Sequence, residues 1–327
     1  MANQLLKTIS LPDSGEKLPF LTVGVMMFGK RADEKESRRI VDAALERGLN
    51  FFDTADAYQN GDSERILGRA LKGRRDRCIV ATKVGYGKTP QGNEEGLSRA
   101  TILRAIDDSL GRLAMDHVDI FYLHRPDPVI PIEESLGAMA EVIRAGKARH
   151  FGISNYGAWQ SLEILHLCDQ NGWPRPVISQ MVCNPLMRGI EIEYCSFARK
   201  YGVLLTVYNP LAGGLLTGKY AGPDDRDKGG RFVNNPIYER RYWSERMFQG
   251  MRGLKAIADS EGMSLTRLAL NWLAQRGKVD NILLGPSNLE QMLDCIAAGE
   301  RPISDAGMKK IDDFLVEFEG TDATYAR

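Results

Sequence analysis

The fold is decided by three short stretches of sequence: Asn50-Phe51-Phe52-Asp53-Thr54-Ala55, Cys78-Ile79-Val80-Ala81-Thr82-Lys83 and Val118-Asp119-Ile120-Phe121-Tyr122-Leu123-His124. Each is rich in residues that favour β-strands, carries an ionisable side chain at or near its end, and precedes a stretch with helical spacing of apolar residues. In a (β/α)8 barrel all strands end at the same face. The sequence therefore predicts that Asp53, Lys83 and His124 meet there, together with Tyr58 just beyond the first stretch.

Strand-like apolar runs alternate with amphipathic helical stretches along most of the chain. The predicted strands begin near Leu21, Asn50, Cys78, Val118, Ala148, Val177, Val203 and Asn281. Helical spacing is clear over residues 35–47, 99–113, 132–145 and 159–168. Strict alternation of strand and helix gives a parallel sheet, and eight such units can close into a barrel. We therefore predict an α/β fold, a (β/α)8 TIM barrel that residues 1–327 form as one domain.

Two segments depart from this alternation. Residues 9–20, with Asp13-Ser14-Gly15 near the centre, predict an N-terminal hairpin that can plug the bottom of the barrel. Residues 221–243, between the seventh and eighth strands, predict a long loop rich in Gly, Asp, Arg and Asn. A loop of this length beside the catalytic face is usually a lid or a binding loop.

The charge balance limits the classes of partner. Lysine plus arginine and aspartate plus glutamate both number 43, so the formal net charge is zero. This leaves no electrostatic footprint for nucleic acid or an anionic membrane surface. No apolar run approaches the ~18 residues of a membrane span, and the N-terminal residues lack a signal-peptide core. We expect a cytoplasmic protein whose partners are small molecules or further copies of itself.

Five cysteines, an odd number, are scattered along the chain without C-x-x-C spacing. This pattern argues against a disulfide framework and against a zinc site. We expect reduced thiols, mainly in the core, and no metal.

Four residues predict acid–base chemistry. A tyrosine hydroxyl is a poor proton donor at neutral pH, but an adjacent ammonium favours the phenolate and lowers the pKa of the phenol. Lys83 can supply that ammonium, and Asp53 can hold it charged. Tyr58 can then protonate a carbonyl oxygen that His124 orients. Taken singly, each has a structural alternative: a buried ion pair, a tyrosine packed at the rim, or a neutral core histidine.

The same residues lie within motifs that resemble the signature of the aldo-keto reductases. The motifs are Phe52-Asp53-Thr54-Ala55-Asp56-Ala57-Tyr58, Gly61-Asp62-Ser63-Glu64, Thr82-Lys83, Tyr122-Leu123-His124 and Gly152-Ile153-Ser154-Asn155. Asn171-Gly172-Trp173, Gly230-Arg231-Phe232 and Arg241-Tyr242-Trp243 resemble the aflatoxin-aldehyde reductase branch. The resemblance implies a (β/α)8 barrel, NADPH-dependent carbonyl reduction without a metal, and a catalytic tetrad at Asp53, Tyr58, Lys83 and His124.

The resemblance also implies a set of contacts to the cofactor. Ser154, Asn155 and Gln180 match side chains that hydrogen-bond the carboxamide, and Tyr208 matches a ring stacked on the nicotinamide. The other implied positions are Gly24, Met26, Asn209, Pro210, Leu211, Gly213, Lys219, Arg231, Gly285, Ser287, Gln291 and Asp294. Among them, Lys219 and Arg231 would pair with the 2′-phosphate. The structural alternative for Ser154 and Asn155 is a turn or a helix cap.

Gly213 to Lys219 also spells the start of a phosphate-binding P-loop. Tyr220 stands where such a loop needs a Ser or Thr hydroxyl, so a glycine-rich turn near a pyrophosphate is the better interpretation. At the adenosine end this chain departs from the family pattern. Cys295 stands where asparagine is usual, and Asp294 replaces Glu or Gln, which predicts a modestly weaker grip on adenine.

Two other function classes stay open at this point. One is a cofactor-binding regulatory module with incidental turnover, like the potassium-channel β-subunits. The other is a metal-dependent barrel hydrolase using Asp53 and His124, although the sequence lacks the clustered ligands that such a site needs. The substrate is not given by these motifs. The C-terminal Arg327 can either pair with a carboxylate on the substrate or lie solvated at the end of the chain.

Overall fold

The computed structural model describes residues 3–11, 15–87, 95–228, 230–233 and 235–320. Its centre is a closed barrel of parallel strands in the order β10-β3-β4-β5-β6-β7-β8-β9. The strands are β3 (Leu21–Gly24), β4 (Phe51–Asp53), β5 (Ile79–Val84), β6 (Val118–Leu123), β7 (Ala148–Ser154), β8 (Ile178–Val182), β9 (Leu204–Tyr208) and β10 (Asn281–Leu284). Every strand begins within one residue of its predicted start, so the (β/α)8 prediction is confirmed.

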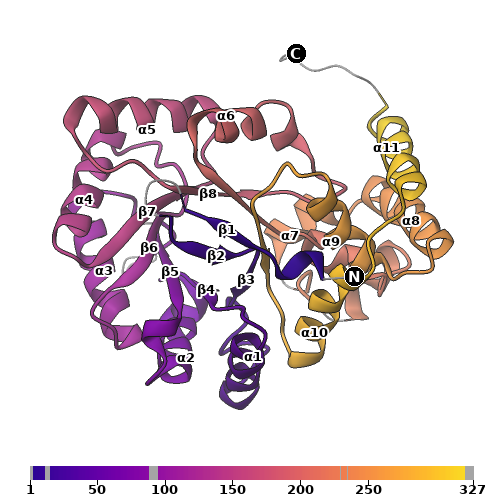
Figure 1. Ribbon diagram of the computed structural model, residues 1–327, viewed down its shortest axis with the longest axis horizontal. Helices are drawn as coiled ribbons and strands as arrows, with labels where there is room; N and C mark the ends of the chain where they lie inside the picture. The colour runs from indigo at the N-terminus through magenta and orange to yellow at the C-terminus, as the bar shows by residue number, and fades with distance from the viewer. Residues whose placement is uncertain (1–2, 12–14, 88–94, 229, 234, 321–327) are drawn as a thin grey trace.

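Helices surround the barrel (Figure 1). They are α1 (Glu34–Glu46), α2 (Asp62–Leu71), α3 (Arg99–Leu113), α4 (Ile132–Arg144), α5 (Ala158–Asn171), α6 (Tyr194–Tyr201), α7 (Pro236–Tyr242), α8 (Glu245–Ser260), α9 (Leu265–Gln275), α10 (Leu289–Ala297) and α11 (Asp305–Glu319). Several begin at a side-chain cap. Asp33 accepts the Glu36 amide at α1, and Ser98 accepts the Thr101 amide at α3. No helix in these described ranges is long and apolar enough to cross a membrane.

The two-residue period of each strand separates the core into two layers. Phe51, Ile79, Ile120 and Ile178 point into the barrel, where they form one apolar cluster. The alternate residues of the strands pack outward against the helices in a second, larger cluster. Since the last inward position of a strand opens at the barrel mouth, polar residues placed there line the site rather than the core.

The predicted hairpin is present. β1 (Thr8–Ser10) and β2 (Lys17–Pro19) pair antiparallel, and the hairpin lies across one end of the barrel in Figure 1. Leu11 and Leu18 join the apolar cluster inside the barrel, so the hairpin closes its bottom. The predicted turn residues Asp13 and Ser14 fall outside the described residues.

The predicted long loop after the seventh strand carries its own short helices. The glycine-rich turn η5 (Ala212–Thr217) follows β9, and η6 (Pro223–Lys228) and α7 lie within residues 221–243. Tyr220, Phe232 and Trp243 form an aromatic cluster that holds this insertion together, with the Phe232 and Trp243 ring centroids 4.6 Å apart. The insertion is therefore anchored beside the mouth of the barrel.

Candidate active site

An ion pair between Lys83 and Asp53 lies at the top of the barrel interior. The register pairs Asp53 with Ala81, so Asp53 and Lys83 share the inward face of neighbouring strands. Lys83 is 0% exposed and Asp53 is 2% exposed. The Lys83 ammonium donates to the Asp53 carboxylate and, at 2.7 Å, to the Thr54 carbonyl oxygen. Gln180 Nε2 donates to the second Asp53 oxygen at 3.0 Å.

Burial and pairing act in opposite directions on this pair. Loss of water raises the pKa of Asp53 and lowers the pKa of Lys83, while their mutual attraction opposes both changes. The hydrogen bond from Gln180 also favours the ionised Asp53. The charge on Lys83 therefore depends on the few groups that contact it.

Tyr58 lies beside this ion pair. It begins η2 (Tyr58–Gly61), where Gln59 and Asn60 adopt positive φ angles of 50° and 54° and turn the chain back toward α2. Lys83 Nζ is 5.4 Å from the centre of the Tyr58 ring. Burial raises the pKa of Tyr58 well above its ordinary value, so desolvation outweighs the lowering expected from the sequence. The phenol keeps its proton at neutral pH.

His124 faces Tyr58 across the barrel mouth. Their ring centroids are 5.8 Å apart in an edge-on arrangement, and Tyr86 approaches His124 from another side with centroids 4.6 Å apart. His124 is 8% exposed, and burial together with the positive charges of Lys83 and Arg125 lowers its pKa well below its ordinary value. The imidazole is therefore neutral and can donate one hydrogen bond to an oxygen in the pocket.

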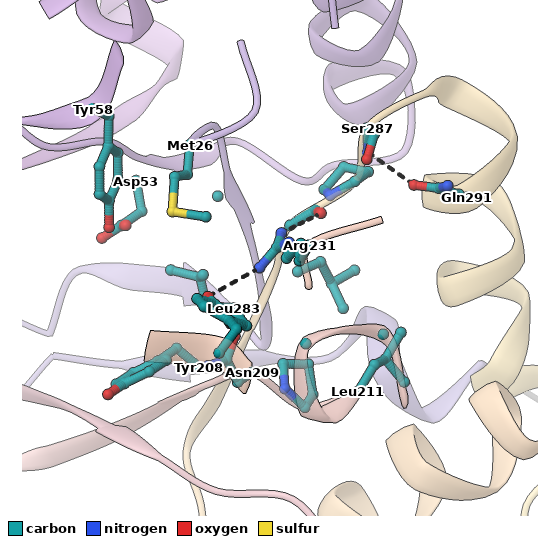
Figure 2. A pocket seen from close by; sticks show the side chains of 18 of the residues that line it. Met26, Asp53, Tyr58, Tyr208, Asn209, Leu211, Arg231, Leu283, Ser287 and Gln291 are labelled. Atoms are coloured by element: carbon teal, nitrogen blue, oxygen red, sulfur yellow. Dashed lines mark hydrogen bonds between the residues drawn. The ribbon is translucent and has the colours of Figure 1, made fainter. Parts of the chain in front are cut away.

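A cavity of about 650 Å³ opens from this point. All the sequence-predicted cofactor positions line it, and so do Asp53, Tyr58 and His124. Lys83 does not line the cavity, because it lies behind Asp53 in the barrel interior. Figure 2 shows Tyr58 and Asp53 at one end of this pocket, Ser287 and Gln291 at the other, and Arg231 between them.

Hydrogen bonds fix the polar residues next to the tetrad. Asn155 Nδ2 donates to the His124 carbonyl oxygen at 2.9 Å, and Tyr208 Oη donates to Asn155 Oδ1 at 2.7 Å. Ser154 Oγ donates to the Gln180 carbonyl oxygen at 2.9 Å. Asn155 is not a helix cap, because Gly157 caps α5. Gln180 has a contact that the sequence did not predict, its bond to Asp53.

The glycine-rich turn after β9 brings the backbone close to the pocket. Gly213 has a φ of 68°, and a Cβ atom there would lie 2.7 Å from the Tyr238 ring. Only glycine fits this position without strain. A short 3-10 helix follows β9, whereas a P-loop requires a long helix, which supports the turn interpretation.

Arg231 connects the insertion to the opposite wall. Its Nη2 donates to the Gly285 carbonyl oxygen at 2.9 Å, and its Nη1 donates to Tyr238 Oη at 3.4 Å. A Cβ atom at Gly285 would lie 2.4 Å from Arg231 Nη2, so the glycine makes this approach possible. Lys219 and Arg31 also line the cavity.

The end of the pocket that the sequence predicts for adenosine is built around the start of α10. Asn288 caps this helix by accepting the Gln291 amide at 2.8 Å, while Gln291 Oε1 accepts the Ser287 amide at 2.9 Å. Asp294 lines the cavity and lies 3.5 Å from Arg267. The thiol of Cys295 is buried at the wall, and burial raises its pKa to about 12.

Sequence reasoning did not assign several residues that line the cavity: Arg31, Ala57, Tyr86, Gly214, Thr217, Ile237, Tyr238, Arg241, Thr266, Leu283, Leu284 and Pro286. Among them, Arg241 is a positively charged neighbour of Tyr208 and lowers the pKa of that phenol against the raising by burial. The available sequence signal for Arg241 was the motif Arg241-Tyr242-Trp243 at the end of the insertion. Arg327 falls outside the described residues, and those residues contain no cluster of three or more His, Cys, Asp or Glu able to hold a metal ion.

Comparison with known proteins shows the family to which this barrel belongs. Residues 21–316 match the model of the aldo/keto reductase family. The chain belongs to the aldo/keto reductase family. It is therefore an oxidoreductase. It is 37% identical over 297 residues to human aldo-keto reductase family 7 member A3, covering 86% of this chain and 89% of that protein.

Two further relatives show the range of proteins that this reductase resembles. Aflatoxin B1 aldehyde reductase member 2 of Rattus norvegicus is 37% identical over 297 residues, covering 86% of this chain and 80% of that protein. A probable voltage-gated potassium channel subunit beta of Arabidopsis thaliana is 35% identical over 295 residues, covering 88% and 90%. The relatives therefore include named reductases and a named channel subunit.

Proposed function

We propose that this reductase transfers hydride from NADPH to the carbonyl carbon of aldehydes or ketones and yields the alcohol. One observation carries the proposal. A fully buried Lys83–Asp53 pair lies behind a protonated Tyr58, and a neutral His124 faces that tyrosine at the end of a long cavity. This combination of a proton donor and an oxygen-orienting imidazole suits a carbonyl group that becomes an alkoxide.

In this mechanism the tetrad acts on the carbonyl oxygen. His124 donates a hydrogen bond to that oxygen and fixes its direction. Tyr58 gives its phenolic proton to the oxygen as negative charge develops there. The resulting phenolate is stabilised by the Lys83 ammonium, and Asp53 keeps that ammonium charged. Asp53 contacts no reacting atom.

The residues along the cavity fit a nicotinamide dinucleotide. Tyr208 offers an aromatic face at the tetrad end, and Gly213 and Gly285 allow close approach of backbone at the centre. Asn209 Nδ2 is buried without a hydrogen-bond partner in the described chain and would find one in a polar ligand. When bound, the dihydronicotinamide supplies the hydride. The chain's own residues position it and exclude water.

The proposed preference for NADPH over NADH rests on three cations that line the cavity. Lys219 and Arg231 come from the turn and insertion after β9, and Arg31 comes from the loop after β3. A 2′-phosphate carries the charge that such groups bind. Comparable KM values for NADPH and NADH would contradict this preference.

For the substrate we propose aldehydes and dicarbonyls, with acidic members favoured. Met26, Tyr86 and Ile237 supply apolar parts of the cavity wall, and Arg241 supplies a cation in the lining. Relatives named as aldehyde reductases support the aldehyde class. The sequence-based proposal that Arg327 adds a second cation rests on residues outside those described.

The alternative is a regulatory module that binds the cofactor with incidental turnover, which the similarity to the Arabidopsis thaliana channel subunit favours. Steady-state rates separate the two. Purified protein is assayed by NADPH oxidation with aromatic aldehydes, dicarbonyls and carboxylated aldehydes, with Tyr58→Phe as the matched variant. We expect catalytic turnover that falls at least ~100-fold in Tyr58→Phe while NADPH still binds. Equal activity in both proteins would refute the mechanism.

A further inference from the structure

We propose that Asp56 is a second counter-ion for the catalytic lysine: it acts through Lys83 and preserves the ammonium at alkaline pH. Asp56 does not line the cavity and contacts no reacting atom, so it is a positioning residue. The inference deepens the proposed function and rests on it. A residue outside the tetrad would thereby support the charge on Lys83 in a pH-dependent way.

The backbone holds Asp56 next to Lys83. Asp56 follows β4 by three residues, and its amide donates to the Lys83 carbonyl oxygen at 3.2 Å. The Asp56 carboxylate raises the pKa of Lys83, as does Asp53, against the lowering by burial. Asp53, Asp56 and, more weakly, Glu64 therefore act on one buried ammonium.

The Asp56 carboxyl is also poorly satisfied, which makes its charge state variable. Its Oδ1 is buried and has no hydrogen-bond partner within the described ranges. Its carboxylate accepts the Ala57 amide. A Cβ atom at Gly87 would lie 3.7 Å from Asp56 Oδ2 and 2.8 Å from Glu95 Oε2, so two carboxylates border the same small residue.

The charged groups around Asp56 form ion pairs with one another or with other residues. On α2, Glu64 is 0% exposed and binds Arg112 of α3 at 2.5 Å. In the segment after β5, Glu95 binds Arg104 of α3 at 2.8 Å. Glu64 repels an ionised Asp56 more strongly than Arg112 attracts it, and Glu95 adds a smaller repulsion. Burial and the Glu64 charge raise the pKa of Asp56 to about 7.

In this environment the Asp56 carboxyl changes its ionisation near neutral pH. Below neutrality Asp56 is protonated, and Asp53, with a smaller contribution from Glu64, holds the charge on Lys83. Above neutrality Asp56 ionises and adds another negative charge beside Lys83, which raises the pKa of the ammonium as the solution becomes able to remove its proton. The ammonium that stabilises the Tyr58 phenolate is thereby kept over a wider pH range.

The test compares kcat for carbonyl reduction at saturating NADPH, from acid to alkaline pH, in the wild type and in Asp56→Asn. The amide mimics the protonated acid, so the two proteins should agree within about twofold at acid pH. In Asp56→Asn the alkaline fall should begin about one pH unit lower and leave kcat ~10-fold below the wild type at alkaline pH. Asp56→Glu, which retains the carboxylate, should restore the wild-type limb.

Asp62→Asn is the matched control, because Asp62 is an exposed carboxylate at the start of α2 that pairs with Arg65. It should not change the profile. A purely structural role for Asp56 predicts a loss by the same factor at every pH, and that outcome would overturn the proposal. An unchanged alkaline limb in Asp56→Asn would overturn it as well.

A second measurement needs neither turnover nor the Asp56 variant. The Lys83 Cε signal is followed by NMR in lysine-labelled wild-type protein and assigned with Lys83→Met. It should show a small inflection near pH 7, where Asp56 ionises, before the main titration of Lys83. Its absence would refute the coupling. If the inflection is present but the protein reduces no carbonyl, the proposed function fails while the Asp56–Lys83 coupling stands.

Discussion

The raised pKa of Asp56 has a consequence for stability that Asp56→Asn exposes. The pKa is 3.8 for an ordinary aspartate and about 7 in the folded protein. Because the folded-state pKa is the higher one, the folded state binds this proton more tightly than the unfolded state. The stabilising contribution is complete below the unfolded pKa and is lost as pH rises through the folded pKa.

The size of the change in unfolding free energy follows from the difference between the unfolded and folded pKa values of Asp56. Between about pH 5 and pH 7 the loss spans two pH units at ~1.36 kcal/mol each, so roughly 3 kcal/mol of unfolding free energy disappears with this one group. The amide of Asp56→Asn does not titrate. The stability of the variant relative to the wild type should therefore rise by up to about 3 kcal/mol between pH 5 and pH 8, whatever their difference at pH 5.

Urea unfolding followed by circular dichroism measures this difference, provided that unfolding is reversible and the slope with urea is the same in both proteins. Asp62→Asn serves as the control, because its exposed carboxylate should give the same difference at both pH values. A constant difference between Asp56→Asn and the wild type at pH 5 and pH 8 would show that Asp56 does not titrate near neutrality, and the reasoning from burial would be wrong.

Four further predictions concern the tetrad, the cofactor and the substrate. Lys83→Met should lower kcat at least ~100-fold with NADPH affinity retained, as measured by steady-state rates and fluorescence titration, because the Tyr58 phenolate loses its cation. Arg231→Ala should weaken NADPH binding by ~10-fold or more and leave the affinity for NADH nearly unchanged, so that the preference for NADPH over NADH becomes smaller. Gly213→Ala should lower the melting temperature and weaken NADPH binding, because its Cβ meets Tyr238 at 2.7 Å. Deletion of residues 325–327 should raise KM for a carboxylated aldehyde several-fold more than for benzaldehyde, and an equal effect on both would remove the tail from substrate selection.

The barrel and most of the site could be predicted because strand ends follow a simple rule. Asp53, Lys83 and His124 each follow an inward-facing apolar residue by two positions, so the strand period alone directs them to the barrel mouth. Parallel strands then bring residues far apart in the chain to the same face. The family motifs supplied the predicted cofactor positions, and every one of them lines the cavity.

The remaining wall could not be predicted in the same way. Ile237, Tyr238 and Arg241 come from α7, a short helix within an insertion whose sequence indicates a loop. Arg31 is an exposed arginine, and no periodic pattern distinguishes it from other surface charges. The placement of such residues depends on how the insertion packs through Phe232 and Trp243, which is a tertiary contact and not a local preference.

The pKa of Tyr58 shows a different limit of sequence reasoning. The sequence places a cation near the phenol and so predicts a lowered pKa, yet burial raises it. Desolvation depends on every atom around the hydroxyl, whereas a motif names only the neighbours with charge. The two effects are compatible in the proposed mechanism. A phenol that holds its proton in the resting enzyme needs the Lys83 ammonium only when the proton leaves.

That requirement explains the groups packed around the lysine. An isolated ammonium as deeply buried as Lys83 would lose its proton, because burial favours the neutral amine. Asp53 and the Thr54 carbonyl oxygen oppose this loss directly. Gln180 opposes it indirectly, since its amide donates to Asp53 and keeps that carboxylate ionised. Removal of the Gln180 amide should therefore weaken the tetrad even at saturating cofactor, which a residue that only binds the nicotinamide would not do.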